Sequence, residues 1–183
     1  MHTDTAVSYT SPQDTGFTQD YFRSALGRFP TGVTVVTTRS AISNEPVGLT
    51  VSSFNSVSLN PPLVLWSLSK TSSSLSHFMQ TDRYVIHVLS AQQLALAKQF
   101  AYGSQPQRFQ GCTPTTSPAG ALMLDDAHFA AWFDCRCVAR HEAGDHIVFI
   151  GQVEHCSRQL LQPLVYHAGD FDLTPSTEPL AQG

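Results

Sequence analysis

Hydrophobic positions along the chain fall in short runs rich in β-branched and aromatic residues, separated by glycine, proline and serine. Such runs are typical of strands bounded by turns. Helical spacing occurs in three places only, over residues 18–27, 71–80 and 90–102. Thr18 is a candidate N-cap of the first helix, and Ser90 with Gln93 forms a candidate capping box at the third. The predicted strands cover residues 33–38, 47–59, 63–68, 84–89, 128–141, 147–157 and 164–166.

These strands do not alternate one-for-one with helices, which favours a β-barrel over a doubly wound sheet. No Gly-x-Gly-x-x-Gly opens a helix, so a Rossmann dinucleotide site is disfavoured. We expect a polar N-terminal arm over residues 1–17, one domain over 18–172 and a C-terminal tail over 173–183. Within the domain, residues 103–119 are predicted to form a loop.

Composition narrows the class of protein. The chain has 183 residues, a formal net charge of −4 and only 13% charged residues, so nothing electrostatic favours binding to nucleic acid. No apolar run is long enough for a membrane helix, and the N-terminal residues lack the pattern of a signal peptide. Because there is no signal-peptide pattern, the four cysteines indicate reduced thiols in a cytoplasmic protein.

The most unusual segment, residues 48–63, alternates small apolar and hydroxyl side chains. Alternation places Thr50 and Ser52 on one face of a strand, and Leu49, Val51 and Ser53 on the other. Hydroxyls and backbone amides can hold a planar heterocycle and a sugar phosphate without surplus cations. An edge strand with a solvated hydroxyl face would explain the same pattern.

A second cluster, residues 67–74, sets Lys70 among hydroxyl side chains at the start of a predicted helix. Free amides and the positive end of the helix dipole make such a position suitable for phosphate. An ordinary N-cap with redundant serines is the alternative.

Three shorter features carry weaker signals. Gly144, Asp145 and His146 form a predicted turn between two strands, with His146 at the head of the second. Arg108 in the predicted loop could pair with phosphate or lie in solvent. Cys135-x-Cys137 does not match the spacing of a zinc ribbon or finger, so we expect a buried pair of thiols and no metal.

Taken in order, residues 22–33, 48–63, 67–74, 108–109 and 144–153 resemble the flavin reductase family with the FMN-binding split-barrel fold. These proteins are the small reductase components of two-component flavin monooxygenases, typified by the 4-hydroxyphenylacetate monooxygenase reductase. The resemblance implies a mainly β split barrel with a few short flanking helices. It also implies a homodimer and hydride transfer from NADH, or alternatively NADPH, to FMN or FAD, with no side-chain nucleophile.

The resemblance also implies roles for individual residues. His146, Asp145, Tyr166 and Phe171 would contact the nicotinamide nucleotide. The flavin would be lined by Thr31, Gly32, Val33, Gly48, Leu49, Thr50, Val51, Ser52, Ser53, Ser67, Leu68, Ser69, Lys70, Ser72, Ser73, Ser74, Ala101 and Arg108.

Two other functions fit the same fold. One is a split-barrel enzyme that keeps FMN as a fixed prosthetic group and reduces another substrate. The other is a non-catalytic flavin- or haem-binding module, which would not oxidise a nicotinamide. The sequence leaves open FMN against FAD, NADH against NADPH, and the identity of any partner monooxygenase.

Overall fold

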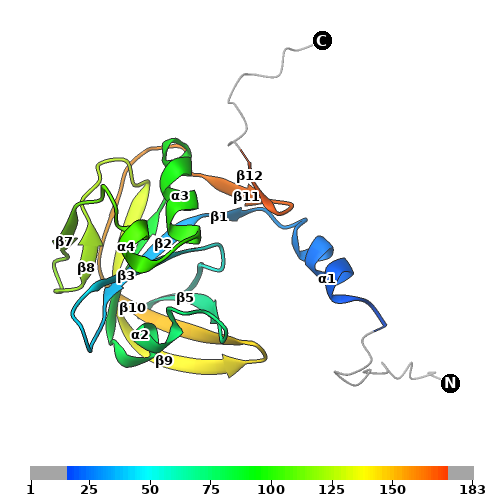
Figure 1. Ribbon diagram of the computed structural model, residues 1–183, viewed down its shortest axis with the longest axis horizontal. Helices are drawn as coiled ribbons and strands as arrows, with labels where there is room; N and C mark the ends of the chain where they lie inside the picture. The colour runs from blue at the N-terminus through cyan, green and yellow to red at the C-terminus, as the bar shows by residue number, and fades with distance from the viewer. Residues whose placement is uncertain (1–15, 173–183) are drawn as a thin grey trace, which may run out of the picture.

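A computed structural model of the chain describes residues 16–172, which form a curled sheet flanked by short helices (Figure 1). The helices are α1 (Gln19–Leu26), α2 (Leu75–Gln80), α3 (Leu94–Ala101, preceded by the 3₁₀ turn Ala91–Gln93) and α4 (Gln105–Arg108). The strands are β1 (Thr31–Gly32), β2 (Thr34–Arg39), β3 (Pro46–Val51), β4 (Asn55–Leu59), β5 (Pro62–Ser69), β6 (Arg83–Val88), β7 (Pro114–Thr116), β8 (Leu122–Leu124), β9 (Ala131–Ala143), β10 (His146–Arg158), β11 (Val165–His167) and β12 (Asp170–Asp172).

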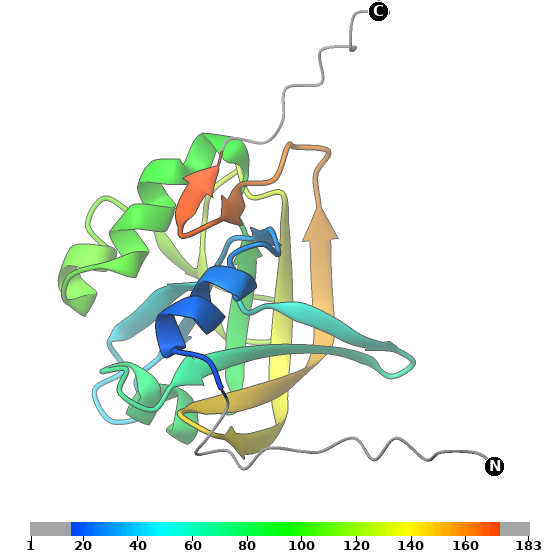
Figure 2. The ribbon, with the colours of Figure 1, turned by 90° about the vertical axis from the view of Figure 1, so that its right-hand side faces the viewer.

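The main sheet has seven antiparallel strands in the order β3-β2-β6-β9-β10-β5-β4. It curls without closing, so β3 and β4 are its two edges. A smaller sheet, β1-β11-β12, lies beside α1, while the β4–β5 hairpin projects from the body (Figure 2). The expected mainly β split-barrel fold is confirmed.

One apolar core fills the inside of the curled sheet. Trp66 is fully buried and stacks on Phe149 at a centroid distance of 4.6 Å, and the rings of Phe78 and Tyr84 pack edge-on against it. Phe78 comes from α2, so this short helix covers part of the core. Aromatic rings of this size supply much of the apolar area that stabilises a domain.

A second core lies on the other face of β2, under α3. Val36 points into the first core and Val35 into the second, as the two-residue period of a strand requires. Ala97 and Phe100 of α3 pack onto this second side and are fully buried. Because both faces of β2 are buried, its sequence is an almost continuous run of β-branched residues.

Several boundaries differ from the sequence predictions. The predicted strand 47–59 is wrong as one element, because residues 52–54 leave the sheet between β3 and β4. The predicted loop 103–119 contains α4 and β7, and helix α2 begins at Leu75, later than expected. The short strands β1, β8 and β12 were not predicted. Of the expected arm 1–17, residues 1–15 lie outside the described residues, as does the whole of the expected tail 173–183.

Two predicted helix starts are confirmed. Thr18 is the N-cap of α1, and its hydroxyl accepts a hydrogen bond from the Tyr21 N–H at 3.2 Å. Ser90 and Gln93 form a capping box, which leads through the 3₁₀ turn into α3. Cys135 and Cys137 are buried on one strand, as expected.

His87 is a fully buried polar group between the sheet and β8. Its Nδ1 lies 3.0 Å from the Val35 carbonyl oxygen, and its Nε2 accepts from the Leu124 N–H at 3.1 Å. Both bonds require the neutral ring with its proton on Nδ1. Burial lowers the pKa of His87 to about 4, from an ordinary value of 6.5.

This shift predicts a loss of stability in mild acid. The unfolded chain binds a proton at His87 below about pH 6.5, while the folded protein resists it until about pH 4. Stability from this group is therefore complete above that window and is lost as the pH falls through it. We expect the free energy of unfolding to fall by about 2 kcal/mol between pH 7.5 and pH 5.

Urea denaturation at a series of pH values measures the effect. His87→Gln should flatten the pH dependence, whereas His141→Gln, at an exposed position, should leave it unchanged. An unaltered slope in His87→Gln would contradict the assignment.

Candidate functional site

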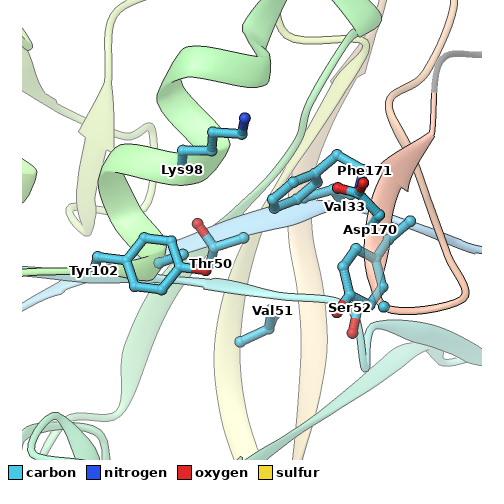
Figure 3. Close-up of a pocket in the computed structure, with 11 residues that line it drawn as sticks. Val33, Thr50, Val51, Ser52, Lys98, Tyr102, Asp170 and Phe171 are labelled. Atoms are coloured by element: carbon cyan, nitrogen blue, oxygen red, sulfur yellow. The ribbon is translucent and has the colours of Figure 1, made fainter.

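A cavity of about 550 Å³ opens at the edge of β3. Its volume lies within the range of small-molecule sites, roughly 300–1,000 Å³. Figure 3 shows Lys98 and Tyr102 entering from the α3 side, Thr50 and Ser52 from β3 and the residue after it, and Phe171 from β12. The lining residues are Val33, Thr50, Val51, Ser52, Lys98, Ala101, Tyr102, Tyr166, Gly169, Asp170 and Phe171.

The free edge of β3 gives this cavity its hydrogen-bonding groups. Side chains of α4 bind both peptide groups of Gly48: the Gly48 N–H donates to Gln105 Oε1 at 2.8 Å, and Arg108 Nη1 donates to the Gly48 carbonyl at 2.8 Å. These groups therefore point away from β2. In an antiparallel pair the direction alternates, so the peptide groups of Thr50 point to the same free side. There they face the cavity, and within residues 16–172 no strand pairs with them.

One hydroxyl adds to the polar lining, and a second lies beside it on β1, where Thr31 pairs with Tyr166 of the cavity wall. Ser52 is exposed on the cavity wall. Thr31, on the neighbouring strand β1, has a buried Oγ1 without a hydrogen-bond partner. A buried hydroxyl normally has a partner, so Thr31 is suited to bond a ligand. The Thr50 hydroxyl, in contrast, donates to the Ala97 carbonyl at 2.7 Å and anchors α3 to the strand.

A second polar group lies where β5 ends beside the β9–β10 turn. His146 pairs with Ser69 in the sheet, and the Lys70 N–H donates to the Asp145 carbonyl at 2.8 Å. The His146 ring bonds the Asp145 carboxylate at 2.8 Å, which lowers the pKa of Asp145. Residues predicted to bind flavin and residues predicted to bind nicotinamide are thus brought together here.

Lys70 is already paired in this group. Its ammonium donates to Glu142 at 2.9 Å, and this hydrogen bond lowers the pKa of the Glu142 carboxyl. Lys98, on the cavity, has no such ion pair among the described residues. The free cation of the site therefore comes from α3.

The predicted residues divide by position. Val33, Thr50, Val51, Ser52 and Ala101 of the flavin set, and Tyr166 and Phe171 of the nicotinamide set, line the cavity. Leu49 and Leu68 point into the first core, so only their backbone is available to a ligand. Gly48 lies beneath the rings of Phe100 and Phe109, and Gly32 is exposed on β1.

The serines of the flavin set are mostly engaged with the protein itself. The Ser53 hydroxyl donates to the Ser67 carbonyl and accepts from the Ser67 N–H, both at 2.9 Å, which joins the end of β3 to β5. The Ser74 hydroxyl accepts from Gln105 at 2.9 Å, and Ser72 accepts from the Ser74 N–H. Ser73 is exposed at the start of α2.

Lys98, Tyr102, Gly169 and Asp170 line the cavity but were not predicted from the sequence. Lys98 lies one helical turn before Ala101, which was predicted, so helical periodicity could have found it. Gly169 and Asp170 carry no comparable signal in the sequence. Among residues 16–172 no cluster of histidine, cysteine and carboxylate side chains is arranged to hold a metal ion. No helix within the same range is long and apolar enough to cross a membrane.

The fold and the cavity define a split-barrel protein with a cavity of ligand size that is lined largely by hydroxyl, peptide and apolar groups. Residues 26–174 match the model of the flavin reductase like domain. The chain belongs to that family. Two curated proteins and one solved structure illustrate the similarity.

It is 41% identical over 150 residues to the FMN reductase (NADH) of Agrobacterium fabrum, covering 82% of this chain and 83% of that one. It is 35% identical over 153 residues to the reductase subunit of a flavin-dependent monooxygenase from Mycobacterium tuberculosis, covering 82% and 79%. The structure of a Streptomyces globisporus NADH:FAD oxidoreductase in complex with NAD and FAD fragments superposes with a TM-score of 0.78. That protein is 31% identical, and the match covers 93% of this chain and 99% of the other.

The packing over Gly48 predicts a stability effect. A Cβ at this position would lie 2.7 Å from Phe100 Cε1 and 3.1 Å from Phe109 Cζ, so the rings would have to move. We expect Gly48→Ala to lower the free energy of unfolding by about 1–3 kcal/mol. Gly32→Ala is the matched control, since its Cβ would meet nothing within 4 Å. Equal stability of the two variants in urea denaturation would contradict the packing argument.

Proposed function

We propose that the protein is an NAD(P)H-dependent flavin reductase that binds FMN or FAD in the β3 cavity and supplies reduced flavin to a partner monooxygenase. The observation that carries this proposal is the open edge of β3, where peptide groups and neutral hydroxyls line a cavity of suitable volume. A flavin ring presents a row of acceptors and donors along one side, which such an edge can match.

The individual residues have separable tasks. Thr31, the Thr50 peptide and Ser52 would bind the ring and the ribityl chain, with Val33 and Val51 as apolar surfaces beneath them. Neutral donors fixed by the sheet stabilise negative charge on a bound ligand without needing to reorient. Bound flavin supplies the hydride-accepting chemistry, so no side-chain nucleophile is required.

The nicotinamide nucleotide would approach from the open side of the same cavity. Tyr166 and Phe171, whose rings pack edge-on at a centroid distance of 5.4 Å, form an aromatic wall there. His146, oriented by its bond to Asp145, would contact the nucleotide from the β9–β10 turn. The family resemblance implies the same roles for these residues.

The phosphate end has two candidate cations. Lys70 was predicted for this role, but it would have to exchange Glu142 for the phosphate. Lys98 needs no such exchange, and it lies on the cavity wall. Arg108 contributes by another route, because its guanidinium donates to the Gly48 carbonyl and, at 3.3 Å, to the carbonyl of Tyr102, which lines the cavity.

A homodimer is part of the proposal. Helix α1 has no buried residue, and its side chains Tyr21, Phe22 and Leu26 are all at least half exposed. The helix is tied to the β11–β12 turn by the bond from the Ala168 N–H to the Gly27 carbonyl, and it lies beside these two strands, which carry residues of the cavity wall (Figure 2). A second copy would cover both. Sedimentation as a monomer would overturn this point, and sedimentation as a dimer would support it.

The partner and cofactors follow from the relatives. Their names include an NADH-dependent FMN reductase, an NADH:FAD oxidoreductase and a monooxygenase reductase subunit, which supports NADH as the electron donor and either flavin as acceptor. Free thiols at all four cysteines agree with the proposed cytoplasmic location.

The direct test follows the absorbance of NADH in air after addition of FMN, FAD or riboflavin. Flavin-dependent oxidation by catalytic amounts of protein is expected, and the ranking of the three flavins identifies the preferred one. Retained flavin without turnover of added flavin would instead indicate a fixed prosthetic group. Flavin binding without oxidation of NADH or NADPH would indicate a binding module.

His146→Ala is expected to weaken use of the nicotinamide while leaving flavin binding nearly intact. Its ring lies on the β9–β10 turn, outside the lining of the cavity, and its bond partner is Asp145. Loss of one orienting contact typically raises KM for NADH by about five- to tenfold. The measurement is KM for NADH at saturating flavin, with flavin affinity from fluorescence titration. Loss of flavin binding would show that His146 belongs to the flavin site.

A further inference from the structure

Gln105, in the first turn of α4, joins two parts of the proposed flavin site that are distant in sequence. Its Oε1 accepts a hydrogen bond from the Gly48 N–H at 2.8 Å, and its Nε2 donates to Ser74 Oγ at 2.9 Å. One amide group thus spans from the edge of β3 to the start of α2. The residue is half-buried, so these bonds are partly shielded from water.

Each partner occupies a defined place in the site. Gly48 lies two residues before Thr50, whose peptide groups face the cavity on the same edge of β3. Ser74 is 1% exposed and is the N-cap residue of α2, at the end of the serine run 72–74 predicted to surround the phosphate. The oxygen and the nitrogen of the Gln105 amide therefore bond to two different segments, and both segments are predicted to bind the flavin.

On the free side of β3, the Gly48 peptide is hydrogen-bonded by side chains of α4. Among residues 16–172 no strand pairs with this side, and Arg108 binds the Gly48 carbonyl. Without Gln105 the Gly48 N–H would have no side-chain acceptor, and the Ser74 hydroxyl would lose its donor. A strand edge without such partners can shift relative to the helix that faces it.

We propose that Gln105 is a positioning residue that sets the spacing between the flavin-binding edge of β3 and the serine run before α2. Gln105 is not among the residues that line the β3 cavity, so we expect it to act on flavin affinity and to leave hydride transfer unaffected. This inference rests on the proposed function, because it assigns a role within that site.

Gln107 supplies a matched control in the same helix. Its Oε1 accepts from the Ser104 N–H at 2.8 Å and the Ser104 hydroxyl at 2.9 Å, which completes a capping box for α4. Gln107→Met therefore perturbs the helix start without removing a bond to Gly48 or Ser74. Gln105→Met removes both bonds and preserves the length of the side chain.

The experiment compares KM for flavin, KM for NADH and kcat in wild type, Gln105→Met, Gln107→Met, Ser74→Ala and the Gln105→Met/Ser74→Ala double variant. Gln105→Met should raise KM for flavin about five- to tenfold with kcat and KM for NADH unchanged. Gln107→Met should leave KM for flavin within about twofold, a change smaller than one hydrogen bond produces. Ser74→Ala should add little to Gln105→Met, because the bond between them is already absent.

Fluorescence titration of flavin gives the dissociation constants independently of turnover, and thermal unfolding reports folding of each variant. Equal flavin affinity in Gln105→Met and wild type would overturn the inference and leave the proposed function intact. Equal loss in Gln105→Met and Gln107→Met would also overturn it, since the effect would then arise from α4 as a whole. A wild type that binds no flavin would overturn the proposed function and this inference together.

Discussion

The free edge of β3 is the constraint on which the rest of the site depends. A sheet that curls without closing leaves backbone donors and acceptors at its edges, and such groups need partners. Here the edge divides into two parts. Gln105 and Arg108 bind the peptide groups of Gly48, while those of Thr50 face the cavity. In the proposed function, this unpaired part of the backbone edge is the surface that binds the flavin.

Packing on either side keeps that surface in place. Gly48 lacks a side chain, which lets the rings of Phe100 and Phe109 cover the strand closely. The Thr50 hydroxyl bonds the Ala97 carbonyl and fixes α3 alongside. Beyond the strand, the Ser53 hydroxyl bonds both peptide groups of Ser67 and bridges the gap to β5. These three contacts hold the free edge of β3, with which no strand of the described residues pairs.

The sequence predicted those elements whose stability is local or whose faces are uniformly buried. β2 was found because both of its faces meet a core, and α3 because Ser90 and Gln93 mark its start. Elements held by tertiary contacts were missed. Helix α4 has four residues in a segment rich in glycine and proline, and β12 exists only through its pairing with β11.

The same distinction applies to the site. Thr50 and Ser52 were identified because alternation in a strand is visible in the sequence, and the structure places both on the cavity. The break after Val51 was not visible, since it depends on Ser53 bonding a strand that comes later in the chain. Gln105 was missed because only the packing of α4 on β3 brings it to the site, whereas Lys98 could have been found from its place one turn before Ala101.

The few charged side chains of the cavity lining agree with a ligand that is bound and then released. Lys70 lies outside the cavity lining and is paired with Glu142. Among the cavity residues the cation is Lys98 and the carboxylate is Asp170. Most of the remaining polar lining consists of hydroxyl and peptide groups. Neutral hydrogen bonds contribute modestly to affinity because water offers competing partners. A site built mainly from them agrees with the proposed role, in which flavin binds, is reduced and leaves for a partner monooxygenase.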